Sequence, residues 1–218
     1  AGLIQGPRFS AAGRQITSQQ GIGDTLPRWI NIEESSFGAL VTTKDELLNE
    51  IRNEVKDGVD LIKIAGSGPG TTEWGAFRLE ELELAVDEAH RLGRPLAIHA
   101  RSRQSAADAV AAGVDWIMHA SYMDLPTLDL AIEKGIPFVP AMTLLVNSLE
   151  SGTMAAAAKD AMQRELDAAV SILSKAYQQG ATLVAGSESG FAMTPYGEWH
   201  TREMELFVSY LGMSDMRA

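Results

Sequence analysis

The sequence contains no cysteine, which excludes disulfide bonds and thiolate zinc sites. Basic residues are also scarce: 18 Lys and Arg stand against 29 Asp and Glu, and the formal net charge is −11. Nucleic acid and anionic membranes need a basic surface, so neither is expected as the main partner. There is no run of about 18 apolar residues that would predict a transmembrane helix. Because cysteine is absent, any metal ion must be bound by histidine, by carboxylate or by a modified side chain.

What remains is the composition of an ordinary globular protein, with 218 residues, of which 45% are hydrophobic and 22% are charged. This length suits one domain or a large piece of one, and we treat residues 1–218 as a single unit. The first 15 residues have neither the charged region nor the apolar region of a signal peptide. We therefore expect a cytoplasmic protein, with a mature secreted form as the alternative.

One local pattern recurs five times: a glycine is followed by a short apolar run. Such runs, rich in Val, Ile and Leu, predict strands that are buried on both faces. Each glycine also follows a helical pattern, where glycine readily supplies the left-handed residue that ends a helix. A weaker first strand is predicted near residues 8–12. The five strands are predicted at 59–64, 94–99, 114–119, 136–141 and 181–186.

Helical patterns alternate with these strands. The first opens with Thr43, followed three residues later by Glu46, which predicts a capping box. Residues 13–40 have little periodicity and predict a long loop on one face of the fold, acting as a lid or a substrate wall. The helices are predicted at 43–57, 79–92, 103–112, 125–134, 154–179 and 198–211.

Repeated strand–helix units favour parallel strands with right-handed crossovers. About six units are present, so we expect an α/β fold of the TIM-type (β/α) barrel class with six of its eight units. A doubly wound open sheet is the alternative, but no GxGxxG or GxxxxGK[ST] motif follows any strand. The glycine-rich stretch 66–70 lacks the following Lys–Ser/Thr and predicts a loop rather than a phosphate site.

Polar residues stand at the ends of four of these strands: Lys63, His99, His119 and Glu188. In a parallel barrel these ends meet at one mouth, where active sites lie. Two histidines and a carboxylate are ordinary ligands of zinc or a similar divalent ion. Taken singly, each residue has a structural interpretation, as an ion-paired lysine, a core histidine or a loop carboxylate. His90 lies within a predicted helix, where a structural role is favoured.

The chain resembles the amidohydrolase superfamily, and in particular its imidazolonepropionase-like and prolidase-like branch. The resemblance extends over nearly the whole chain and rests on the order Lys, His, His, acid at the strand ends. It is carried by GVDLIKIAGSG, ELELAVDEAHRLGRPLAIHA, AAGVDWIMHASYMD, GIPFVPAMT and GATLVAGSESG.

The resemblance implies a role for each residue. Lys63 matches a lysine that is carboxylated in many members and bridges two metals, and His99 and His119 match metal ligands. Glu188 stands where the family usually has an aspartate that binds metal and moves the proton of the attacking water. Tyr122 matches a tyrosine that contacts substrate in some relatives. The implied cofactor is one or two divalent ions, most simply zinc. Arg101 and His200 are further substrate-contact candidates, because they lie near the same mouth in sequence.

Two departures from the family pattern stand out. No HxH motif occurs in the chain, although the family has one on its first strand. We therefore expect that N-terminal strands and a small flanking β-domain belong to a longer protein, or that a homo-oligomer completes the barrel. Glu188 replaces the usual aspartate, and its extra methylene moves the carboxylate by about 1 Å, a shift that can cost about 10²-fold in rate.

The expected activity is hydrolysis of a C–N bond by metal-activated water, in a small substrate such as a dipeptide, an acyl amino acid or a cyclic amide. A second interpretation makes Lys63 a Schiff-base nucleophile, since barrel aldolases also carry a lysine at a strand end. A third is an inactive barrel remnant with a structural or partner-binding role, whose open sheet edges need to be covered.

Overall fold

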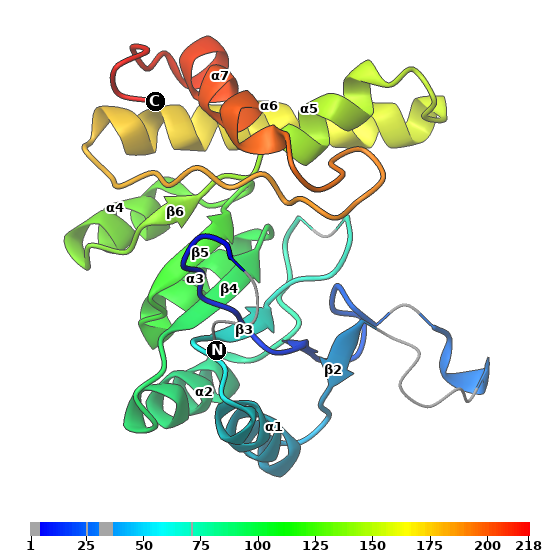
Figure 1. Ribbon diagram of the computed structural model, residues 1–218, viewed down its shortest axis with the longest axis vertical. Coiled ribbons are helices and arrows are strands. Elements are labelled where there is room, and N and C mark those ends of the chain that lie inside the picture. Colours follow the sequence, from blue (N-terminus) through cyan, green and yellow to red (C-terminus); the bar gives the residue numbers. More distant parts are fainter. Residues whose placement is uncertain (1–4, 25, 31–36, 71) are drawn as a thin grey trace.

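The computed structural model describes residues 5–24, 26–30, 37–70 and 72–218 (Figure 1). Six strands form one sheet in the order β2-β1-β3-β4-β5-β6, and every pair of neighbours is parallel. The strands are β1 (Gln15–Thr17), β2 (Gly38–Leu40), β3 (Ile62–Ala65), β4 (Leu96–Ala100), β5 (Trp116–His119) and β6 (Phe138–Val139).

The predicted helices are present with small changes at their ends. A capping box starts α1 as predicted: Glu46 N donates to Thr43 Oγ1 over 3.2 Å, and Thr43 N donates to the Glu46 carboxylate over 3.0 Å. In the described part of the chain, no helix is both long and apolar enough to cross a membrane. The helices are α1 (Lys44–Asp57), α2 (Leu79–Arg91), α3 (Arg103–Ala112), α4 (Leu125–Glu133), α5 (Thr143–Glu150), α6 (Ala156–Gln178) and α7 (Trp199–Leu211), with a short 3-10 turn at Arg28–Ile30.

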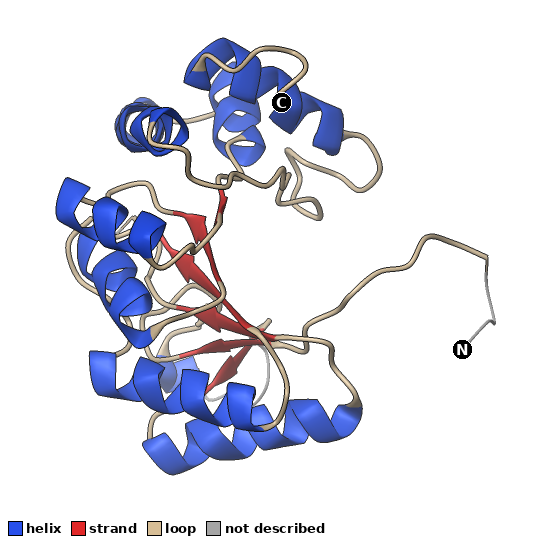
Figure 2. Cartoon of the chain, turned by 90° about the vertical axis from the view of Figure 1, so that its left-hand side faces the viewer, coloured by secondary structure: helices blue, strands red, loops and turns tan. Residues whose placement is uncertain are grey.

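The order of the strands in the sheet distinguishes between the two predicted fold classes, the TIM-type barrel and the doubly wound sheet. From β3 to β6 the chain adds each strand on the same side of the previous one, so right-handed crossovers place all the connecting helices on one face. Helices α1 to α4 accordingly pack each against the next, and Figure 2 shows them together on one side of the sheet. A doubly wound sheet would divide its helices between both faces. The arrangement is that of a barrel wall.

One loop prediction and two strand predictions were wrong in detail. Residues 13–40 are not one loop, because β1 and β2 lie within them; each strand has only three residues, too few to show a period of two. The strand predicted near 8–12 is reduced to one bridge between Ala12 and Leu61. The described residues of 181–186 likewise form a single parallel bridge, between Leu183 and Phe138. Strand pairing, which the local sequence does not reveal, decides these cases.

The glycines predicted to end helices adopt the required conformation. Gly58 follows α1 with a φ of 92°, and Gly113 follows α3 with a φ of 80°. In each case the glycine N–H donates to carbonyl groups of the last helical turn, which prepares the chain to turn back into the next strand. These caps set the start of β3 and β5, and therefore the position of the residues at their ends.

The alternation of β3 decides which side chains face the mouth. Ile62 and Ile64 are fully buried in the core cluster shared with α1 and α2. Lys63 lies between them and so points to the opposite face of the sheet. The register pairs Ala65 with His99, two positions along from Lys63, so His99 shares the face of the lysine. The face opposite the helices therefore carries the chemically active side chains.

Candidate functional site

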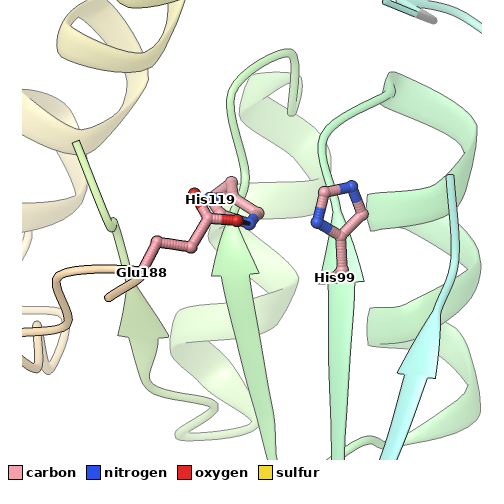
Figure 3. A group of neighbouring side chains, drawn as sticks. All are labelled: His99, His119 and Glu188. Atoms are coloured by element: carbon pink, nitrogen blue, oxygen red, sulfur yellow. Dashed lines mark ion pairs between the residues drawn. The ribbon is translucent and has the colours of Figure 1, made fainter. Parts of the chain in front are cut away.

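Three of the four predicted strand-end residues meet in space. His99 is on β4, His119 is the last residue of β5, and Glu188 follows the Leu183 bridge. One ligand atom from each lies within 4.8 Å of the others. The imidazole rings are edge to face, with centroids 4.6 Å apart, and His119 Nε2 lies 3.5 Å from Glu188 Oε1. Figure 3 shows Glu188 beside His119, joined by the ion-pair line, with His99 on the neighbouring strand.

The backbone places these residues by two different means. His99 reaches the mouth through ordinary strand alternation. His119 follows Met118, which pairs with His99, so alternation alone would turn His119 to the helix side. Its φ of 72°, followed by 57° at Ala120, redirects the side chain instead. Glu188 has a φ of 52°. Left-handed non-glycine residues cost about 1–3 kcal/mol each and cluster at active sites.

The two histidines are held as neutral imidazoles. Burial lowers the pKa of His99 well below its usual 6.5, and the positive charges of Arg101 and Lys63 act in the same direction. Burial also lowers the pKa of His119 well below that value, against a hydrogen bond with the Pro140 backbone that raises it. Among the described residues, the buried Nε2 atom of His99 has no hydrogen-bond partner. A neutral imidazole with such an atom is suited to bind a metal ion.

Glu188 is held at its carboxylate by Arg101 and at its backbone carbonyl by Thr194. Arg101 Nη2 donates to Glu188 Oε2 over 3.4 Å, while the Thr194 hydroxyl donates to the Glu188 carbonyl over 2.7 Å. Burial raises the pKa of Glu188, and the charges of Arg101 and Lys63 lower it. A raised pKa makes the carboxylate a stronger base, which suits a group that accepts a proton in catalysis.

Lys63 lies beside this group rather than within it. Its Nζ atom is 2.6 Å from Met118 Sδ, a neighbour that carries no compensating charge. Burial lowers the pKa of Lys63 to about 7, although Glu188 raises it, and Arg101 lowers it further. The lowered pKa makes the neutral, nucleophilic amine far more accessible than in an exposed lysine. This chemistry fits both carboxylation by CO2 and Schiff-base formation.

One member of the site was not predicted from the sequence. Glu165 on α6 is buried, and its Oε1 lies 3.0 Å from Arg101 Nη1. The Ser121 hydroxyl donates to the same oxygen over 3.1 Å. Nothing in the local sequence distinguishes Glu165 from other acidic residues of this long helix. Only the packing of α6 over the ends of β4 and β5 brings it to the mouth.

The remaining candidates lie at different distances from the cluster. Tyr122 N donates to the Arg101 carbonyl over 2.9 Å, and burial, followed by the charge of Glu165, raises the pKa of the tyrosine. His200 is exposed on α7 and is not among the three residues that converge. His90 Nε2 lies 2.8 Å from Asp115 Oδ2, consistent with the structural role favoured for it. The described residues of the 66–70 stretch form a loop, as predicted.

Comparisons with known proteins identify the family of the chain. The sequence profile described as "Amidohydrolase family" matches residues 2–200. Ochratoxinase from Aspergillus niger is 24% identical over a 238-residue alignment that covers 100% of this chain and 48% of that protein. The chain thus spans about half the length of this curated relative.

Solved structures show the same architecture. The crystal structure of A. niger ochratoxinase superimposes with a TM-score of 0.86 at 23% identity, over 98% of this chain and 52% of that one. A Xaa-Pro dipeptidase with methionine bound in its active site has a TM-score of 0.77 at 26% identity, over 97% and 54%. A prolidase complexed with N-methylphosphonate-L-proline has a TM-score of 0.80 at 23% identity, over 97% of this chain and 55% of that one. The predicted fold, a partial TIM-type barrel, is confirmed.

Proposed function

This chain belongs to the amidohydrolase family, and from that premise we propose that it is a metal-dependent hydrolase that cleaves C–N bonds. One observation carries the proposal: His99, His119 and Glu188 offer three ligand atoms within 4.8 Å of one another. Two neutral imidazoles and a carboxylate suit Zn²⁺, which binds nitrogen and oxygen ligands in such sets. The buried Nε2 of His99, which has no hydrogen-bond partner in the described part of the chain, supports the same assignment.

When bound, a divalent ion supplies a Lewis acid that polarises the scissile carbonyl and lowers the pKa of water. The chain's own residues do the rest. His99 and His119 would hold the ion, which requires both imidazoles to be neutral. Glu188 accepts a proton from the attacking water and passes it to the leaving nitrogen, so that a C–O bond forms as the C–N bond breaks. The raised pKa of Glu188 favours the first of these transfers, because it makes the carboxylate a stronger base.

We further propose that Lys63 is carboxylated. Its neutral amine attacks CO2, an N–C bond forms, and a proton is released, leaving an anionic carbamate. This reaction needs an unprotonated amine, which a pKa of about 7 provides. It also converts a cation beside two histidines into an oxygen ligand, which would allow one or two ions to be held. The absence of a compensating charge at Met118 Sδ favours the uncharged starting amine.

The substrate we propose is a small molecule of dipeptide or N-acyl amino acid type. Two of the structurally similar proteins are a Xaa-Pro dipeptidase and a prolidase complexed with N-methylphosphonate-L-proline. Arg101 has a buried Nε atom that no described residue hydrogen-bonds, which makes it a candidate donor to the substrate. Tyr122 and His200 complete the proposed contacts. We also propose that further segments of a longer protein, or a second copy, supply the other barrel strands.

The test is hydrolysis by metal-reconstituted protein. The chain is stripped of metal, reconstituted with Zn²⁺ and incubated with a panel of Xaa-Pro dipeptides and N-acyl amino acids, and amine release is measured. We expect release that depends on Zn²⁺ and is lost in Glu188→Gln. Full occupancy of the site by zinc without hydrolysis of any panel member would overturn the proposed activity.

A further inference from the structure

Glu165 connects helix α6 to the two segments that follow β4 and β5, the strands that carry the histidines. It lies on α6, which contributes none of the proposed ligands, yet Oε1 contacts Arg101 Nη1 at 3.0 Å and Ser121 Oγ at 3.1 Å. Arg101 directly follows β4, and Ser121 lies two residues beyond the end of β5. The carboxylate is buried, so these contacts are shielded from solvent.

Arg101 in turn uses a different nitrogen for each carboxylate. Nη1 faces Glu165, whereas Nη2 donates to Glu188 Oε2 over 3.4 Å. The guanidinium is therefore a bridge, and its plane is fixed at both ends. Glu188 has only one oxygen on this bridge, which leaves Oε1 facing His119 Nε2 at 3.5 Å. An arginine with no second partner would be free to take both oxygens in a bidentate pair.

We propose that Glu165 is a positioning residue: it holds one end of the Arg101 guanidinium, keeps Glu188 aimed at His119, and so strengthens metal binding by the cluster. The inference rests on the proposed function. Without the Glu165 charge, Arg101 turns fully toward Glu188 and competes with a cation for the carboxylate oxygens. This relay of contacts, from Glu165 through Arg101 to Glu188, also suits a glutamate at position 188. Compared with aspartate, the extra methylene of glutamate brings more rotamers that need to be restrained.

The test measures affinity for a metal rather than turnover. Metal-depleted chain is titrated with Co²⁺, whose visible spectrum reports ligand geometry, and Glu165→Gln is compared with Asp167→Asn. Asp167 is exposed on the same helix, so the control makes the same change of charge away from the site. Removing a residue that orients a ligand typically costs 10–100-fold in metal affinity, and we expect about that loss, with a changed spectrum, for Glu165→Gln alone.

A second set of variants separates the relay from a general loss of packing. Arg101→Lys keeps the charge but cannot bridge two carboxylates, so it is expected to weaken Co²⁺ binding as Glu165→Gln does. In a Glu188→Asp background the shorter side chain reaches Arg101 poorly, and Glu165→Gln is expected to have little further effect.

The outcomes are distinguishable. Unchanged affinity and spectrum in Glu165→Gln, or an equal loss in the parent and Glu188→Asp backgrounds, would overturn the relay while leaving the metal site intact. Co²⁺ binding to His99→Ala as tight as to the parent chain would instead overturn the proposed function itself.

Discussion

The Nε2 atom of His119 lies 3.5 Å from Oε1 of Glu188, and both residues have a positive φ, of 72° and 52°. Two non-glycine residues in the left-handed region thus face each other. Neither conformation is favourable on its own, so the surroundings must hold it. The Pro140 backbone restrains the His119 ring, and the Thr194 hydroxyl holds the Glu188 carbonyl. The strained backbone is thereby part of how the cluster is assembled.

Glu188→Gln is expected to lower kcat by about 10²–10⁴-fold, the usual contribution of general acid–base catalysis. The amide has nearly the shape of the carboxylate but cannot accept the proton. The measurement is kcat on a Xaa-Pro dipeptide, with metal content determined on the same samples. Undiminished kcat at equal metal content would remove Glu188 from the mechanism.

The metal-depleted chain is expected to lose stability in acid through its two buried histidines. Their folded-state pKa lies well below 6.5, so below about pH 6.5 the unfolded chain binds protons that the folded chain excludes. Stability then falls as the pH decreases, by up to about 1.4 kcal/mol per pH unit for each histidine. Urea unfolding between pH 7.5 and 5 measures this slope. Replacing both histidines with leucine should flatten it, and an unchanged slope would contradict the assignment.

Lys63 is expected to take up CO2. With a pKa of about 7, its amine is mostly neutral above that pH and mostly protonated below it. Protein incubated with ¹³C-bicarbonate at pH 8 should show a carbamate carbon by NMR, which should be absent in Lys63→Met. Borohydride trapping of a substrate carbonyl on Lys63, without a carbamate signal, would favour the Schiff-base enzyme instead.

Glu54→Gln is expected to stabilise the chain at neutral and mildly alkaline pH. Both carboxylate oxygens of Glu54 are buried and have no hydrogen-bond partner among the residues that the structure describes, and burial raises the pKa of Glu54 from 4.5 to about 8. The folded state therefore keeps a proton that the unfolded chain loses above about pH 4.5, and stability decreases from there to about pH 8. The variant avoids this loss, which amounts to at most about 1.4 kcal/mol per pH unit.

The matched control is Glu83→Gln, at an exposed carboxylate on α2. The free energy of unfolding of both variants is compared with that of the parent chain at pH 5, 6.5 and 8. Only Glu54→Gln should gain relative stability as the pH rises. A gain that does not depend on pH would rule out ionisation as the cause.

Much of the fold follows from local sequence. The capping box at Thr43 and the glycine caps at Gly58 and Gly113 are local signals, and the sequence predicted all three. The three-residue strands β1 and β2 are not, because their existence depends on pairing with β3 and with each other. Residues 181–186 form a single bridge, at Leu183, for the same reason. An apolar run forms a strand only where a neighbouring strand extends alongside it.

The candidate site also has a part that the sequence predicts and a part that it does not. Strand ends in a parallel fold converge, which was enough to predict that His99, His119 and Glu188 lie near one mouth. Alternation alone would have turned His119 away, and its positive φ is not visible in the sequence. Glu165 could not be predicted at all, since its role depends on where α6 packs. The sequence thus identifies the chemistry of the site better than the contacts that hold it.

Metal content is the most direct test of the central claim. Chain purified without chelator is analysed for zinc and other divalent metals by elemental analysis, beside His99→Ala, His119→Ala and the control His90→Ala. We predict at least one ion per parent chain and per control chain, and loss of metal in both site variants. Full metal occupancy in either site variant, or a parent chain that fails to bind Zn²⁺ when it is supplied, would contradict a metal centre formed by His99, His119 and Glu188.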